Sequence, residues 1–381
     1  MIYYLQKEII MPLFMPHIIK KKILFIGPRL HTNYLGSFKA LIKNNFKLYF
    51  FAKLSNGGED HSLIKPIIIQ ESYFSKIRKI IFGDIKSNNS QYFPKISKFV
   101  KLVRKIRPDY SIIRLHGRLY TYFSALIIKF FGGKIIFYDQ IDLSNHKFSK
   151  LEKIEIFLRK LIFDDKLISP ICSTKKTLKD NFYFVPFCSD IVKKKSFSNK
   201  KLKILSIGKF QRRKNYLLLI KVVEDLSKTI NIQLNIVGEC QNKSHKEHKK
   251  EIINYIDSKK LNKIINIKKY IKHNKIDNLY KNNDLFILPA ENEIASVSIV
   301  EALGFGLPVI CSDDCGSQVY VKNGYNGFIF KKNNALSLKN KITKFTNVRN
   351  KKKFSINAFY DAKKNFSKKK YILMLNKVLY S

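Results

Sequence analysis

A chain of 381 residues is too long for one ordinary hydrophobic core and has the length of two domains. Hydrophobic residues make up 45% of it, which excludes a generally disordered protein. The formal net charge of +45 favours a partner that carries phosphates, such as nucleic acid, anionic lipid or a nucleotide. The lysines lie along nearly every predicted helix, however, so charge alone identifies no function.

Residues 1–20 are expected to form an N-terminal extension. Their longest apolar run, Ile9 to Met15, contains Pro12, and no small-residue cleavage pattern follows it, so we predict no signal peptide. The apolar stretch 125–138 is interrupted by lysine and glycine and is too short to span a bilayer. The five cysteines show no zinc-site spacing, so we expect them to be reduced and expect no metal site. These features predict a cytoplasmic protein that is soluble or peripherally bound.

The first half of the chain predicts an N-terminal domain over residues 21–188. Continuous apolar runs, typical of strands buried on both faces of a parallel sheet, alternate with helical stretches. The predicted strands are 22–27, 47–51, 111–115 and 134–138, and the predicted helices are 37–44 and 120–131. Strand and helix in alternation indicate a parallel sheet with right-handed crossovers.

The second half repeats this pattern after a polar, lysine-rich linker over 189–201. A C-terminal domain is predicted over 202–354, and the tail 355–381 has helical spacing. The predicted strands here are 203–208, 233–238, 284–289 and 308–312, with a helix at 216–226. Two open parallel sheets make the chain an α/β protein and place a ligand in the crevice beyond the carboxyl ends of the strands.

Two glutamates carry the strongest chemical signal. Glu293 follows a predicted strand, and Glu301 lies on the next helix just past its first turn, so the N-terminus of that helix lies between the two carboxylates. Its free amides and its dipole can hold a diphosphate while the carboxylates accept bonds from sugar hydroxyls. The same spacing has a purely structural interpretation, because Ser298 and Glu301 also match a capping box.

The stretch around these glutamates resembles the donor-binding signature of the retaining GT-B glycosyltransferases, the family 4-like group (glycosyl transferases group 1). The matching residues are Glu293, Glu301, Ala302, Gly304, Gly306, Pro308 and Val309, with a downstream glycine turn at 323–330. The resemblance implies two Rossmann-like domains facing each other across a cleft, with Glu301 on the nucleotide ribose, Glu293 on the transferred sugar and Ser298 among the donor contacts. One departure affects the sugar preference: Ala295-Ser296-Val297 stands where the family usually has Phe-Gly-Leu.

A second match lies in the basic loop 208–215. Gly208 follows a strand, and Lys209 and Lys214 precede a helix, so this loop can hold phosphates by charge and by backbone amides. Lys209 stands where the family commonly has arginine, and an ammonium binds as a point charge rather than as a fork. The alternative is an ordinary lysine-rich surface loop.

The N-terminal domain is expected to hold the acceptor. His116 follows a strand, and the resemblance implies that it lies close to the transferred sugar. Asp139 ends the next strand, and Gly27, Arg29 and Gly36 are predicted in the first loop over the cleft.

The resemblance implies transfer of a sugar from a nucleoside-diphosphate sugar, a substrate and not a cofactor, to a glycan or lipid-linked acceptor with retention of configuration. We expect no metal and no nucleic acid, and a role in surface polysaccharide or lipopolysaccharide synthesis. Charge suggests an anionic membrane surface as a further partner, at the inner face of the membrane. Two alternatives remain open: a basic nucleic-acid-binding protein, and a sugar-nucleotide epimerase of the same fold.

Overall fold

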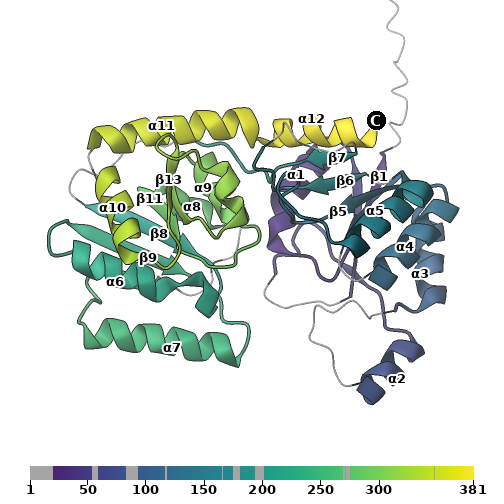
Figure 1. Cartoon of the computed structure of the whole chain (residues 1–381), viewed down its shortest axis with the longest axis horizontal. Helices are drawn as coiled ribbons and strands as arrows, with labels where there is room; N and C mark the ends of the chain where they lie inside the picture. Colours follow the sequence, from purple (N-terminus) through teal and green to yellow (C-terminus); the bar gives the residue numbers. More distant parts are fainter. Residues whose placement is uncertain are drawn as a thin grey trace, which may run out of the picture.

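The computed structural model describes residues 20–53, 59–82, 93–115, 118–164, 166–174, 181–193, 201–268, 271, 275–346 and 348–381. They form two separate sheets, of seven and of six strands (Figure 1). The strand orders are β3-β2-β1-β4-β5-β6-β7 and β10-β9-β8-β11-β12-β13, with all neighbours parallel. Apart from the added β7, both sheets have the order of a doubly wound nucleotide-binding fold. The predicted α/β class with two Rossmann-like domains is confirmed.

The N-terminal domain is built on strands that helices cover on both faces. Its strands are β1 (Lys22–Gly27), β2 (Lys47–Ala52), β3 (Ile67–Ile68), β4 (Tyr110–Arg114), β5 (Lys134–Tyr138), β6 (Leu167–Ser169) and β7 (Phe182–Phe184). Its helices are α1 (Leu35–Lys43), α2 (Tyr73–Phe82), α3 (Ile96–Ile106), α4 (Arg118–Phe130) and α5 (Lys150–Phe163). The four predicted strands are confirmed as β1, β2, β4 and β5, of which β1 and β4 are almost wholly buried.

The C-terminal domain follows the same plan. Its strands are β8 (Leu202–Ile207), β9 (Ile232–Val237), β10 (Ile265–Lys268), β11 (Leu285–Leu288), β12 (Val309–Ser312) and β13 (Gly327–Phe330). Its helices are α6 (Tyr216–Leu226), α7 (Lys243–Ser258), α8 (Asp277–Lys281), α9 (Val297–Gly304) and α10 (Ala335–Phe345). The predicted strands are confirmed as β8, β9, β11 and β12, and the predicted helix 216–226 is α6.

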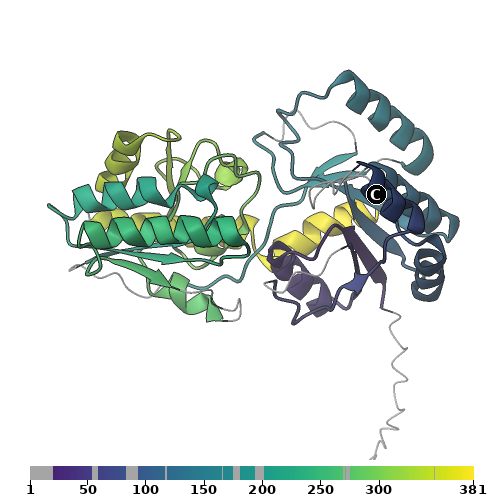
Figure 2. The same cartoon turned by 90° about the horizontal axis from the view of Figure 1, so that it is seen from below.

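The C-terminal tail forms two helices rather than one. α11 (Val348–Asn365) packs against α9 in the C-terminal domain. Ser367 then begins α12 (Lys368–Leu379), because its side chain accepts a hydrogen bond from the Lys370 amide. α12 packs against α1, and Leu375 and Val378 are buried in the N-terminal core. The tail therefore crosses back from one domain to the other, as Figures 1 and 2 show.

Close contact between the domains depends on a glycine in α1. A Cβ atom built on Gly36 would lie 2.2 Å from the carbonyl oxygen of Cys188, which lies on the segment that leaves the N-terminal sheet. Ser189 lies on the same segment and packs equally closely against α9. A Cβ atom built on Gly304 of α9 would lie 2.0 Å from the Ser189 hydroxyl oxygen. Both glycines thus let helices of the two domains lie directly against this connecting segment.

We expect Gly36→Ala to destabilise the protein by about 1–3 kcal/mol, because the added methyl group must displace backbone. Alanine would stabilise an ordinary helix position, so the sign of the effect identifies the close contact. Gly27→Ala is the matched control, since its Cβ would make contacts no shorter than 3.4 Å. Urea unfolding of both variants measures the difference, and an unchanged or raised stability of Gly36→Ala would contradict the packing role.

Candidate functional site

A cavity of about 500 Å³ lies between the two domains, at the carboxyl ends of both sheets. In each sheet the strand order reverses between the first and fourth strands, and that switch point is where such folds bind ligands. The predicted residues that line the cavity are Arg29, Gly208, Lys209, Lys214, Glu293, Ser298 and Glu301. The structure therefore brings the basic loop and both glutamates into one site.

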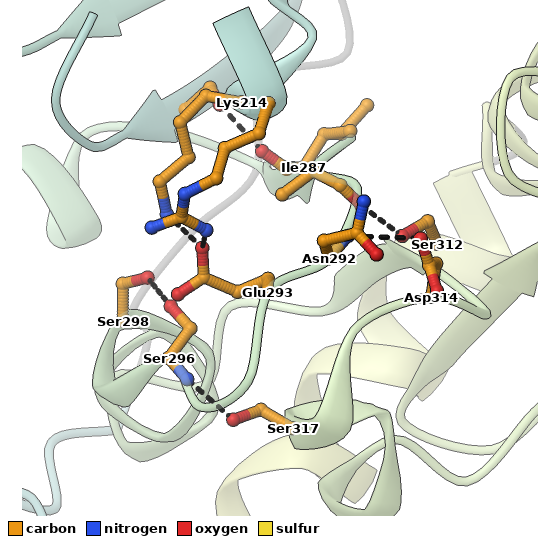
Figure 3. Close-up of polar contacts among 12 residues, drawn as sticks. Lys214, Ile287, Asn292, Glu293, Ser296, Ser298, Ser312, Asp314 and Ser317 are labelled. Atoms are coloured by element: carbon orange, nitrogen blue, oxygen red, sulfur yellow. Dashed lines mark hydrogen bonds and ion pairs between the residues drawn. The ribbon is translucent and has the colours of Figure 1, made fainter. Parts of the chain in front are cut away.

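Glu293 is buried against two cations of the basic loop. Its carboxylate accepts a hydrogen bond from the Lys214 ammonium at 2.8 Å and a second from the Arg213 guanidinium. Burial opposes ionisation of this carboxyl, but the charges of Lys214 and Arg213 hold its pKa below the ordinary value. Figure 3 shows Lys214 directed at Glu293 from above, with the start of α9 below. The basic loop is thus held by ion pairs to the glutamate loop, and it is not an ordinary surface loop.

Glu301 is held by a residue that no motif identifies. The hydroxyl of Tyr280, on α8, donates a hydrogen bond to its carboxylate at 2.8 Å. The Tyr280 ring is fully buried and stacks on Phe305, with ring centroids 5.4 Å apart. Burial, together with the charge of Glu301, raises the pKa of this tyrosine, so the hydroxyl stays a donor. The carboxylate is therefore fixed in direction at the edge of the cavity.

The capping-box interpretation of Ser298 and Glu301 is wrong. α9 begins at Val297, and its N-cap is Ser296 rather than Ser298. Ser296 donates its amide hydrogen to the Ser317 hydroxyl at 2.7 Å, and its own hydroxyl lies 2.7 Å from that of Ser298. The N-terminus of α9 lies between the two glutamates, as the spacing predicts, and Val297 and Ser298 line the cavity there.

Lys209 forms an ion pair across the cleft. Its ammonium lies 3.6 Å from the carboxylate of Glu59, which belongs to the N-terminal domain. Glu59 also accepts hydrogen bonds from the Thr32 amide at 2.9 Å and the Thr32 hydroxyl at 2.7 Å, and lies 3.6 Å from a ring nitrogen of His31. Burial opposes ionisation of Glu59, but these hydrogen bonds and the Lys209 charge lower its pKa. The predicted phosphate-binding lysine is thus paired with a carboxylate of the other domain.

Gly208 allows two side chains to approach the end of β8. A Cβ on this residue would lie 2.9 Å from the Tyr216 hydroxyl oxygen and 3.0 Å from the Lys214 side chain. The Tyr216 hydroxyl is buried and has no hydrogen-bond partner among the residues described here. Glycine therefore leaves room for Lys214 to reach Glu293 past the buried Tyr216 hydroxyl, since a Cβ here would make both side chains shift.

The N-terminal side of the cavity differs from the prediction. The described lining residues do not include Asp139, Gly27 or Gly36. They do include Tyr138 and Gln140, which precede and follow Asp139 in the sequence. Asp139 is turned toward its own loop, where its carboxylate accepts the Gln140 amide at 2.7 Å. Gly27 ends β1, and Gly36 packs against Cys188. His116 lies outside the described residues.

Several cavity residues lacked a sequence signal. The N-terminal wall includes Arg114, whose guanidinium donates to the Gln140 side chain at 3.1 Å, and His31, which accepts a hydrogen bond from the predicted Arg29 at 3.0 Å. Arg213 lies within the recognised basic loop and could have been found there, whereas Glu59 and Tyr280 belong to segments without a motif. Among the described residues, no three His, Cys, Asp or Glu side chains gather as ligands for a metal ion.

Comparison with known proteins agrees with this geometry. Residues 188–360 match the family described as Glycosyl transferases group 1. The chain is 24% identical over 289 residues to the alpha-monoglucosyldiacylglycerol synthase of Acholeplasma laidlawii, covering 71% of this chain and 68% of that enzyme. Among solved structures, a glycosyltransferase from Rickettsia africae aligns over 95% of this chain and 98% of its own (TM-score 0.69, 16% identity). Anabaena HepE, solved with UDP and glucose, aligns over 95% and 100% (TM-score 0.67, 16% identity).

We expect Lys214→Met to destabilise the protein by about 2 kcal/mol, because the buried Glu293 carboxylate keeps only Arg213 as a partner. The double variant Lys214→Met/Glu293→Gln should be more stable than the single one, since no buried charge is left and Arg213, 40% exposed, can turn to water. Urea unfolding tests both. A double variant that is less stable than Lys214→Met would show that the ion pair does not govern this loop.

A double-mutant cycle with Glu59→Gln and Lys209→Met should give a coupling free energy of about 1 kcal/mol without ligand, since the pair is mostly shielded from water. Among the contacts of the described residues, the ion pair is the one that both substitutions remove. Additive effects, within about 0.3 kcal/mol, would show that the two groups do not interact across the cleft in solution.

Proposed function

Because residues 188–360 match the group 1 glycosyltransferases and the whole chain has the GT-B fold, we propose that its cavity binds a nucleoside-diphosphate hexose and transfers the hexose to a glycan or lipid-linked acceptor with retention. The observation that carries this proposal is the grouping of two carboxylates, the N-terminus of α9 and the basic loop in one interdomain cavity. UDP is the first nucleoside diphosphate to test, because HepE was solved with UDP and glucose.

The donor assignment follows from complementary charge and hydrogen bonding. Glu301 accepts bonds from the ribose hydroxyls, and the amides at the start of α9 face the diphosphate. Lys209 supplies a cation for the same diphosphate once the contact with Glu59 is released. Glu293 lies nearest the transferred hexose, held in place by Lys214 and Arg213.

In the proposed transfer, the carbon–oxygen bond between the hexose and the diphosphate breaks, and the acceptor hydroxyl forms the new bond on the same face. The acceptor proton passes to a phosphate oxygen of the departing nucleoside diphosphate. The protein contributes by orienting both substrates and by stabilising the negative charge that develops on the leaving group. Lys209 and the N-terminus of α9 provide that positive potential.

We propose a lipid-linked acceptor in surface polysaccharide or lipopolysaccharide synthesis, with the protein held at the inner face of the membrane. The lipid product named for the Acholeplasma relative supports this class of acceptor. The net charge of +45 favours contact with anionic lipids. No helix in the described part of the chain is both long and apolar enough to cross a bilayer.

Thermal unfolding with UDP, GDP, their hexose conjugates and a short polynucleotide tests the donor site. A ligand at 100 times its dissociation constant stabilises the protein by about 2.7 kcal/mol, or roughly a few degrees in the unfolding midpoint. We expect one nucleoside diphosphate to give this shift. Glu301→Ala should weaken its binding roughly tenfold or more, because the ribose loses a charged hydrogen-bond acceptor.

Glu291→Ala is the matched control, since Glu291 lies on the loop that leads into α9 but bonds to Asn215 rather than lining the cavity. It should keep the full response. A salt-sensitive response to polynucleotide alone would favour the nucleic-acid alternative. Release of free sugar without transfer, whatever acceptor is added, would favour the epimerase. Proton NMR of a transfer product reports the anomeric configuration and tests retention.

A further inference from the structure

Helix α5 has its apolar face turned outward. Leu151, Ile154, Phe157, Leu158 and Leu161 recur every three or four residues, so they form one stripe along the helix. All five are exposed, Leu161 to 74%. A helix on the surface of a globular protein normally buries such a stripe, and an exposed one indicates a surface that binds a partner.

The opposite face of α5 carries the polar groups. Arg159 is only 4% exposed, and its guanidinium lies 5.2 Å from the centre of the Phe137 ring in the sheet. Glu155 accepts a hydrogen bond from the Tyr122 hydroxyl of α4. These polar contacts fix the rotation of α5 about its axis, so the outward position of the apolar stripe is built into the domain.

The apolar surface continues onto α4 and has a basic margin. α4 lies beside α5, joined to it by the Lys129 ammonium and the Ile162 carbonyl, and exposes Phe130 to 83% (Figure 1). Lys150, Lys153 and Lys160 are exposed on α5 itself. At the C-terminal end of α5, a hollow of about 600 Å³ is lined by Lys129, Lys134, Lys160 and Lys166 and by Asp164.

We propose that the outward face of α5, together with Phe130 of α4, docks on the surface of an anionic lipid bilayer. The helix, about 21 Å long, lies in the plane of the interface with its apolar stripe among the acyl chains. Its lysines extend to the lipid phosphates, and the basic hollow accepts a headgroup phosphate. The inference deepens the proposed function and rests on it for the membrane location, which it assigns to one surface of the N-terminal domain.

Charge decides between a bilayer and a second copy of this chain. In a two-fold contact through α5, the lysines beside the stripe of one copy would face those of the other copy. The two copies, each of net charge +45, would repel each other. An anionic bilayer neutralises the same lysines while it covers the apolar side chains. The bilayer therefore satisfies both features of the surface.

Vesicle flotation of the full-length protein tests the surface. The variant Leu151→Ser/Phe157→Ser/Leu161→Ser replaces three of the five stripe residues without touching a buried side chain. Leu336→Ser/Ile356→Ser/Leu373→Ser is the matched control, with three exposed apolar residues on α10, α11 and α12. Phosphatidylcholine vesicles with and without phosphatidylglycerol are the probes, and nucleotide-induced thermal shifts show whether each protein keeps its fold and donor site.

We expect the wild-type and control proteins to float with phosphatidylglycerol-containing vesicles, and the α5 variant to bind them roughly tenfold or more weakly. Equal binding of the α5 variant would overturn the inference while leaving the donor site standing. So would failure of the wild-type protein to float, or a dimer in solution that the α5 substitutions convert to a monomer. Loss of binding in the α5 variant, with no nucleotide response in any protein, would support the surface and contradict the proposed donor site.

Discussion

The buried carboxylate of Glu293 imposes the main constraint on the site. A carboxylate that is 7% exposed requires cationic partners, and Lys214 and Arg213 of the basic loop supply them. These ion pairs join the loop after β8 to the loop after β11, the two strands at the switch point of the C-terminal sheet. The position of the basic loop and the glycine at its start both fit this contact.

The central part of the fold could be predicted from the sequence because its strands are buried on both faces. Continuous apolar runs identify β1, β4, β5 and β8, which are also the strands that carry the cavity. The edge strands β3 and β7, and β6 beside β7, are two or three residues long, too short for a pattern. The division of the tail into α11 and α12 was also missed, because helical spacing does not show against which domain a helix packs.

The C-terminal side of the cavity was predictable, whereas on the N-terminal side Arg29 lines the cavity as predicted but Asp139, Gly27 and Gly36 do not. Local motifs were enough to bring together Glu293, Glu301, Lys209 and Lys214. The segments that hold these residues follow β8 and β11, which are neighbours in one parallel sheet, so they meet at the same edge. Glu59 and Tyr280 act through contacts between segments far apart in the sequence, which no local pattern records. Gly36 was expected over the cleft, but a glycine required for packing and one required by a ligand look alike in a sequence.

The return of α12 to the N-terminal domain has a consequence for synthesis in the cell. The ribosome completes the first domain's strands long before it releases residues 371–379, yet Leu375, Val378 and Leu379 belong to that domain's core. Until α12 has emerged, the nascent N-terminal domain exposes the apolar face of α1 that this helix covers. The N-terminal domain therefore completes its core only after the whole C-terminal domain has been synthesised, and a nonsense codon just before α12 would leave both domains present and the first one incomplete.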